Sequence, residues 1–193
     1  MSTPGGAQQV TLVRHGATEW SRARRHTGRT DVPLDEDGRR QAEKAGVRLG
    51  GLHFDRVLTS PLSRAADTCR LAGLDDCQPC DDLLEWDYGA YEGRTTADIR
   101  AERPGWLLWR DGAPGGEQAA DVGRRVDRVI ASLRAQPGDA VLFAHAHVLR
   151  VLAARWIGLA PAGGSCLVLD PASLSVLGYE REVPVIRRWN EPP

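Results

Sequence analysis

The chain lacks an excess of charge of either sign. Its 25 lysine and arginine residues are balanced by 26 aspartate and glutamate residues, which leaves a formal net charge of −1 at pH 7. A protein that binds nucleic acid or a membrane surface through general electrostatics needs a large basic excess. We therefore expect neither nucleic acid nor a membrane as a partner.

Lysine is almost absent, because Lys44 is the only one and all other basic residues are arginine. Arginine presents a rigid fork of donors that suits carboxylate or phosphate groups. An enrichment this broad also fits a bias in genomic base composition. It does not by itself indicate a ligand.

Long apolar runs are missing as well. No stretch is long enough to span a bilayer, and residues 1–9 are too polar for a signal peptide. The sequence has no internal repeat, no low-complexity segment and no Gly/Ser linker that would divide domains. It therefore predicts a single soluble, cytoplasmic domain over residues 1–193.

Cysteine is scarce, with residues only at Cys69, Cys77, Cys80 and Cys166. Cys77 and Cys80 have the Cys-x-x-Cys spacing of a redox or zinc element. No second pair of Cys or His ligands lies nearby, and residues 81–84 are typical of a strand end or turn rather than of a helix start. We expect ordinary thiols in a reducing compartment, where disulfides are rare.

Strand-like and helix-like segments alternate along the chain. Apolar β-branched runs predict strands ending near residue 14 and over residues 54–59, 140–144, 166–169, 174–179 and 183–189, of which the last three form two or three antiparallel strands. Helical periodicity predicts helices over about residues 35–49, 122–133 and 147–157. This order predicts an α/β fold, a three-layer α/β/α sandwich around a mostly parallel mixed sheet.

Ser60 and Pro61 form the strongest helix-start signal in the chain. Serine is a preferred N-cap, and proline is favoured at the first helical position. Arg64 would then lie in the first turn, where the helix dipole and unpaired N–H groups favour an anion.

Reactive side chains follow the predicted strands. Arg14 and His15 come at the end of the first strand, His145 follows strand 140–144, and Glu85 follows a short apolar pair. Ligands of open α/β sheets bind outside the carboxyl ends of the strands. Each residue alone also fits an ordinary role, as a solvated arginine, a core histidine or a surface acid. Together with Arg64 they predict a compact cationic pocket with one carboxylate at its rim.

Such a pocket suits phosphoryl transfer. Arginine pairs bidentately with phosphate oxygens, and cations around His15 disfavour its protonated form, which leaves a neutral nitrogen for attack. A nucleophilic histidine splits the displacement into two steps through a covalent intermediate. Glu85 would protonate the leaving oxygen and later take a proton from the attacking water.

The segment Leu-Val-Arg-His-Gly-Ala-Thr-Glu-Trp at residues 12–20 resembles the signature of the histidine phosphatase superfamily, the phosphoglycerate-mutase-like proteins. Further segments resemble other motifs of that family and occur in the family's order, at residues 27–34, 59–68, 84–93 and 143–147. The likeness covers the chain from about Val10 to Arg150. It implies a phosphoglycerate-mutase-like fold that requires no metal and no cofactor.

The resemblance also implies residue roles. His15 becomes phosphorylated, Glu85 is the proton donor, and the phosphoryl group is held by Arg14, Arg64 and His145. The predicted substrate-binding set is Arg14, Ser21, Thr27, Gly28, Arg64 and His145.

Two positions depart from the family's pattern. Many members have asparagine where this chain has Ser21, and the shorter serine leaves a direct phosphate contact open. Many have glycine at the position of Ala146, a change that matters only if this residue needs a positive φ.

Three functions are compatible with these residues. A phosphatase of small-molecule phosphomonoesters, similar to the acid-phosphatase and sugar-phosphatase branch, is favoured because no room exists after Glu85 for the insertion that encloses the substrate of the mutases. A cofactor-dependent phosphoglycerate mutase is the alternative. A catalytically inert module that binds a phosphorylated ligand is the third, although it predicts a missing nucleophile, arginine or acid.

Several aromatic residues are candidates for walls of the pocket mouth, namely Trp20, Trp86, Tyr88, Tyr91, Trp106 and Trp109. The more ordinary expectation places most of them in the core. Aryl or sugar phosphates are plausible substrates if some face the site. The sequence does not fix the oligomeric state and leaves a homodimer open.

Overall fold

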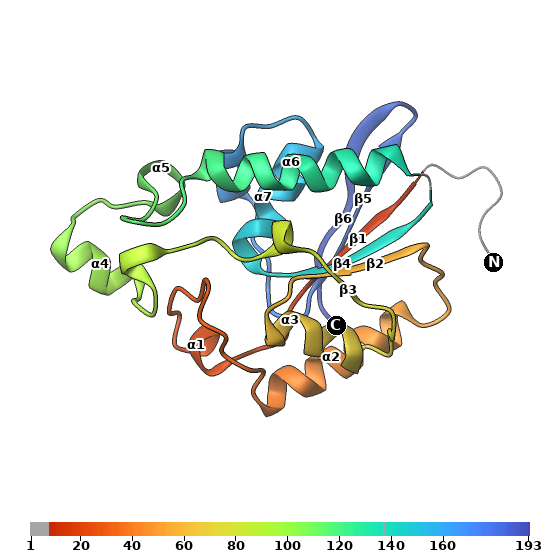
Figure 1. Cartoon of the computed structure of the whole chain (residues 1–193), viewed down its shortest axis with the longest axis horizontal. Helices are drawn as coiled ribbons and strands as arrows, with labels where there is room; N and C mark the ends of the chain where they lie inside the picture. The colour runs from red at the N-terminus through yellow and green to blue at the C-terminus, as the bar shows by residue number, and fades with distance from the viewer. Residues whose placement is uncertain (1–7, 137) are drawn as a thin grey trace.

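The computed structural model describes residues 8–136 and 138–193. Residues 1–7 lie outside the described residues. They belong to the segment 1–9, for which the sequence predicts no signal peptide. The described part forms a mixed six-stranded sheet with helices on both faces (Figure 1). The predicted three-layer α/β/α sandwich is confirmed.

The strands follow the order β3-β2-β4-β1-β5-β6 across the sheet. Strands β1 to β4 are mutually parallel, whereas β5 runs antiparallel to β1 and β6 antiparallel to β5. Their bounds, from β1 to β6, are Val10–Arg14, Arg56–Thr59, Gln78–Pro79, Ala140–Ala144, Leu174–Glu180 and Val183–Glu191. The strand predicted over residues 166–169 is wrong. Cys166 ends a 3-10 segment (η3, Pro161–Cys166), and residues 167–169 follow it without joining the sheet.

Two pairs of helices cover the sheet (Figure 1). Helices α2 (Glu36–Leu49) and α3 (Ser63–Leu71) lie on one face, and α6 (Ala119–Ala135) and α7 (Ala146–Trp156) lie on the other. The remaining segments are α1 (Glu19–Arg22), η1 (Asp81–Leu83), η2 (Gly89–Tyr91), α4 (Thr96–Glu102) and α5 (Leu108–Asp111).

The central strands supply side chains to two separate cores. Leu12 and Leu142 pack with α6 and α7, whereas Val13 and Phe143 point to the other face and pack with α2 and α3. This follows from the alternation of side chains along a strand. All four are fully buried, and each contributes roughly 1.5–3 kcal/mol through apolar burial. The two cores hold β1 and β4 side by side at the centre of the sheet.

The predicted N-cap at Ser60 is wrong. Helix α3 begins at Ser63, and its N-cap position has no side-chain hydrogen bond. The backbone N–H of Ser63 donates instead to Asp31 Oδ1 at 2.9 Å. The hydroxyl oxygen of Ser60 lies 2.8 Å from His145 Nε2 and accepts only a long bond, of 3.4 Å, from the backbone N–H of Leu62 before the helix. Its shorter contact is therefore with a residue distant in the sequence. Arg64 nevertheless lies in the first turn of α3, as predicted.

The prediction of ordinary thiols is wrong for two cysteines. Cys69 on α3 and Cys77 before β3 form a disulfide with a Cα–Cα distance of 6.5 Å, whereas Cys80 and Cys166 are free thiols. The error arose because eight residues of sequence separation do not show that α3 and the following turn bring the two residues together. The cytoplasmic location stays a prediction. Reduced cysteines no longer support it, because two of the four form a disulfide.

Among the described residues, no helix combines the length and the apolar character needed to cross a membrane.

Candidate active site

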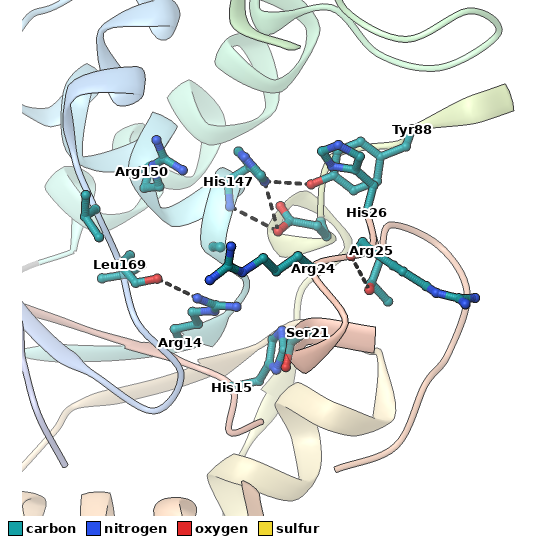
Figure 2. Close-up of a pocket in the computed structure, with 14 residues that line it drawn as sticks. Arg14, His15, Ser21, Arg24, Arg25, His26, Tyr88, His147, Arg150 and Leu169 are labelled. Atoms are coloured by element: carbon teal, nitrogen blue, oxygen red, sulfur yellow. Dashed lines mark hydrogen bonds and ion pairs between the residues drawn. The ribbon is translucent and has the colours of Figure 1, made fainter. Parts of the chain in front are cut away.

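A cavity of about 270 Å³ opens at the carboxyl ends of β1 and β4, and Figure 2 shows the residues around it. Arg14 at the end of β1 is paired with Ala144 at the end of β4. His15 and His145 therefore leave the sheet as neighbours, and their ring centroids lie 5.1 Å apart. Two motifs that are 130 residues apart in the sequence are thus joined by one strand pairing.

His15 is only 5% exposed and lines the cavity. Its Nδ1 donates to the carbonyl oxygen of Gly16 at 2.7 Å, so the proton of the neutral ring resides on Nδ1 and Nε2 carries a lone pair. Burial, together with the guanidinium groups of Arg64 and Arg14, lowers the pKa of His15 well below its usual range. The ring is therefore neutral near pH 7 and can act as a nucleophile.

Gly16 lets the loop after β1 lie against helix α2. A Cβ at Gly16 would lie 2.2 Å from the carbonyl oxygen of Gly38, which is a backbone atom and cannot be displaced easily. The backbone N–H of Gly16 donates to Thr68 Oγ1 at 3.1 Å, and that hydroxyl donates to the Arg64 carbonyl at 2.7 Å. These contacts tie the segment bearing His15 to helix α3.

Arg64 is completely buried beside the two histidines. Its Nε donates to His145 Nδ1 at 3.1 Å, its Nη1 donates to the carbonyl of Thr30, and its Nη2 donates to those of Thr27 and Gly28. In this arrangement the guanidinium holds the 27–30 loop. It lies behind the cavity wall, and its predicted contact with a phosphoryl group stays a prediction.

His145 is also fully buried, and both of its ring nitrogens are engaged. Because Nδ1 accepts from Arg64, Nε2 carries the proton and donates to Ser60 Oγ at 2.8 Å. Burial lowers the pKa of His145, and the positive charge of Arg64 adds to this effect. His145 thus forms a neutral bridge between Arg64 and Ser60, and its predicted contact with the phosphoryl group also stays a prediction.

Arg14 is the buried guanidinium that lines the cavity directly. Its Nη1 donates to the carbonyl of Leu169 at 2.5 Å, whereas its Nε is buried with no hydrogen-bond partner in the described part of the chain. Burial lowers the pKa of Arg14 from its usual value, although arginine stays charged at any relevant pH. An unpaired buried donor is costly, and an anion beside His15 would satisfy it.

Glu85 lies in the wall of the cavity and is only 3% exposed, so it is not at the rim as predicted. Its carboxylate accepts from the backbone N–H groups of Trp86, His147 and Val148 at 2.9, 3.0 and 2.9 Å. Two of these donors belong to the first turn of α7, where unpaired N–H groups and the helix dipole favour a carboxylate. Helix α7 therefore fixes the acid opposite His15.

The three remaining predicted substrate-binding residues have different environments. Ser21 and Thr27 line the cavity. The hydroxyl of Ser21 also accepts from the N–H of Thr18 at 2.9 Å, which closes the start of α1. Gly28 is buried behind the wall, where its carbonyl accepts from Arg64 and its N–H donates to Glu92. Ala146 begins α7 without a positive φ, so alanine is compatible with this position.

The sequence reasoning did not assign seven of the lining residues to the cavity: Arg24, Arg25, His26, His147, Arg150, Val168 and Leu169. Tyr88, one of the six aromatic candidates for the cavity wall, does line it. The hydroxyl of Tyr88 lies 2.6 Å from His147 Nδ1, and His147 in turn lies beside Glu85 (Figure 2). Burial lowers the pKa of His26 to about 4. His147 and Arg150 had a signal in the sequence, because positions three apart at the start of a helix share one face. Arg24 had none.

Most of the six aromatic candidates lie in the core, which confirms the more ordinary of the two expectations drawn from the sequence. Trp86, Tyr91 and Trp106 are buried in the main core, and only Tyr88 of the six candidates lines the cavity. The cavity is therefore lined mainly by arginine and histidine. Aryl and sugar phosphates as substrates stay a prediction.

Comparison with known proteins adds an independent observation. Residues 10–192 match the family model described as "Histidine phosphatase superfamily (branch 1)". An acid phosphatase of Mycobacterium tuberculosis is 44% identical over 179 residues, which cover 91% of this chain and 88% of the relative. A sedoheptulose 1,7-bisphosphatase of Saccharomyces cerevisiae is 36% identical over 190 residues, covering 81% of this chain and 70% of the relative.

A solved structure shows the same fold. The product of an open reading frame from Mycobacterium tuberculosis superposes with a TM-score of 0.92 at 40% identity, and the match covers 96% of this chain and 98% of that one.

Proposed function

Since the chain belongs to the histidine phosphatase superfamily, we propose that it hydrolyses small-molecule phosphomonoesters through a phosphohistidine on His15, with Glu85 as the proton donor. The observation that carries this proposal is the tautomer of His15. A buried, neutral imidazole presents its Nε2 lone pair to a cavity that also holds Arg14 and Glu85.

In the first step, His15 Nε2 attacks the phosphorus atom of the bound ester. An N–P bond forms while the bond between phosphorus and the leaving oxygen breaks. Glu85 in its protonated form gives a proton to that oxygen, so that an alcohol leaves. Arg14 supplies the positive charge that stabilises the phosphoryl oxygens during transfer.

In the second step, Glu85 is a carboxylate and takes a proton from water. The water oxygen attacks the phosphorus atom of the phosphohistidine, the N–P bond breaks, and inorganic phosphate leaves. His15 recovers its lone pair on Nε2, and Glu85 is protonated again. The backbone donors that hold Glu85 fix its position through both steps.

Several finer features belong to this proposal. We propose that the enzyme is of the acid-phosphatase type and works without a metal or cofactor, because guanidinium groups supply the charge at the phosphoryl group. Activity that persists after treatment with EDTA would support metal independence. Location in the cytoplasm, the absence of nucleic-acid and membrane partners, and a homodimer remain proposals of the same kind.

Phosphate release from a panel of phosphomonoesters tests the function, with the His15→Ala variant as the control. We expect release by the wild-type protein and a loss of at least about 10³-fold in the variant, since a covalent nucleophile is removed. Radiolabel from the substrate should appear on wild-type protein only.

Two results would contradict a phosphatase. Net interconversion of phosphoglycerates in the presence of the bisphosphate, faster than phosphate release, would identify a mutase. Tight binding of phosphate esters without turnover or labelling would identify a binding module.

A further inference from the structure

The outer part of the cavity holds more positive charge than one phosphoryl group needs. Arg14 and the buried Arg64 lie next to His15, where the transferred group would bind. Arg24, Arg25 and Arg150 also line the cavity, and Glu85 is the only carboxylate among the lining residues that the structure describes. The guanidinium groups of Arg24 and Arg150 are not needed for the reaction at His15.

Neither Arg24 nor Arg150 has a carboxylate within 4.0 Å in the described part of the chain. Arg22, two residues before Arg24, lies outside the cavity and pairs with Asp35 at 2.6 Å and with Asp37. The charge of Arg22 is thus balanced by acidic side chains, whereas the charges of Arg24 and Arg150 are not.

Arg150 is held rigidly at the cavity wall. Its Nε donates to the carbonyl of Gly164 at 3.0 Å, its Nη2 donates to that of Ser165 at 3.2 Å, and its guanidinium stacks on Trp109 with 4.7 Å to the ring centroid. Nη1 takes part in none of these bonds. A guanidinium fixed in this way loses little side-chain entropy when it binds an anion.

Arg24 adopts a backbone conformation that favours glycine. Its φ is +55°, in the left-handed region, which an L-residue with a Cβ occupies at a cost. Its side chain extends across the cavity toward the wall that carries Arg14 and Arg150 (Figure 2). The next residue, Arg25, also lines the cavity, but its side chain extends away from Arg14 and Arg150 and its guanidinium stacks over Trp20 (Figure 2). Arg24 therefore carries its guanidinium over the cavity from a backbone position where glycine would be less strained.

We propose that Arg24 and Arg150 form a second anion-binding subsite, which selects phosphomonoesters that carry another phosphate or a carboxylate on the same molecule. This inference rests on the proposed phosphatase function and specifies its substrate class. The phosphoryl group to be removed lies at His15 beside Arg14, and the second anion is bound by Arg24 and by Nη1 of Arg150. A cavity of about 270 Å³ suits a small metabolite with two such groups.

The test compares substrates that differ only in the distant group. One pair is 3-phosphoglycerate and glycerol 3-phosphate, and the other is fructose 1,6-bisphosphate and fructose 1-phosphate. For each pair, kcat/KM is measured by phosphate release, and the ratio of the doubly anionic to the singly anionic substrate is calculated. This ratio cancels changes that affect both substrates equally.

The variants are Arg24→Gln, Arg24→Gly and Arg150→Gln, with Arg39→Gln as the matched control. Arg24→Gly removes the side chain and relieves the left-handed backbone, so it should fold at least as well as the wild type. Arg39→Gln removes the same charge from an exposed position on α2 that does not line the cavity.

We expect the wild-type ratio to exceed about ten and to fall by about tenfold in each Arg24 and Arg150 variant, since a charge-assisted hydrogen bond is lost. The ratio should stay the same in Arg39→Gln, and the wild-type ratio should decrease as salt is added. A wild-type ratio near one, or an equal fall in the Arg39→Gln control, would overturn the subsite while leaving the phosphatase intact. An absence of His15-dependent phosphate release from all four substrates would instead overturn the proposed function.

Discussion

Nδ1 of His15 donates its proton to the carbonyl oxygen of Gly16, at 2.7 Å, and this bond selects the nitrogen that can react. A carbonyl oxygen only accepts, so the ring cannot place its proton on Nε2 without losing the contact. The tautomer is thus set by the backbone of the next residue in the chain.

This contact predicts which phosphohistidine isomer forms. The phosphoryl group should be bound to Nε2 of His15, and the Nδ1 isomer should be absent. Two-dimensional ¹H–³¹P NMR of the protein, trapped with substrate and unfolded in alkali, distinguishes the two isomers. The His15→Ala variant controls for phosphorylation at other histidines, and a signal from the Nδ1 isomer would contradict the assigned tautomer.

The position of Glu85 predicts a loss that depends on the leaving group. Glu85→Gln keeps an oxygen for the N–H donors of α7 but cannot transfer a proton. We expect kcat for alkyl phosphates to fall by about 10²–10⁴-fold. The fall should be much smaller for p-nitrophenyl phosphate, whose leaving group needs little protonation. Glu102→Gln, at an exposed site on α4, is the control, and equal losses on both substrates would exclude Glu85 as the acid.

The central strands could be predicted because they are continuous apolar runs. Strand β4 spans residues 140–144 as expected, and all five residues are buried. The two-residue strand β3 (Gln78–Pro79) carries no such pattern and was not predicted. The rule that ligands bind outside the carboxyl ends of the strands indicated the edge of the sheet where His15 and His145 lie, whereas the pairing of β1 with β4 that makes them neighbours comes from the structure.

The directions of the side chains could not be predicted. The sequence places Arg64 in the first turn of α3, but its donors are bound by the carbonyls of residues 27, 28 and 30. Ser60 carries a strong local signal for capping, yet His145 takes its hydroxyl. Both outcomes depend on residues more than 30 positions away. A local pattern therefore identifies which group is present but not which partner it binds.

The bond between Ser60 and His145 predicts a stability loss. Ser60→Ala would leave the Nε2 proton of His145 buried without a partner, which costs about 1–3 kcal/mol of the free energy of unfolding. Urea denaturation measures this loss. Ser132→Ala, at an exposed position on α6, should change the free energy of unfolding by less than about 0.5 kcal/mol. A Ser60→Ala variant as stable as that control would show that the hydrogen bond contributes nothing.

The disulfide between Cys69 and Cys77 predicts a redox-dependent stability. It closes a short loop between α3 and β3, and the entropy of closing such a loop corresponds to about 2–3 kcal/mol. Thermal unfolding with and without a reductant should show a higher Tm for the oxidised protein. The Cys77→Ala variant should show no such difference. Identical Tm values for the oxidised and reduced wild type would contradict the prediction, provided that mass spectrometry confirms the two states.

His26 predicts how the free energy of unfolding depends on pH. Burial against Tyr88 and Trp106 lowers its folded-state pKa to about 4, whereas an unfolded histidine has a pKa near 6.5. Between these values the unfolded chain binds a proton that the folded chain does not. The stabilisation is therefore complete above about pH 6.5 and is lost as the pH falls toward 4, by about 3 kcal/mol for this group.

Replacing the ring tests this contribution separately from the other buried histidines. His26→Gln removes one titrating group, so its free energy of unfolding should decrease less steeply than that of the wild type between pH 6.5 and pH 4. The difference between the two curves should reach about 3 kcal/mol at the acid end. Ser132→Ala, at an exposed position on α6, removes no titrating group and should leave the slope of the wild-type curve unchanged. Parallel curves for the wild type and His26→Gln would mean that the pKa of His26 is the same in the folded and unfolded chains. That result would contradict the lowered pKa on which the prediction rests.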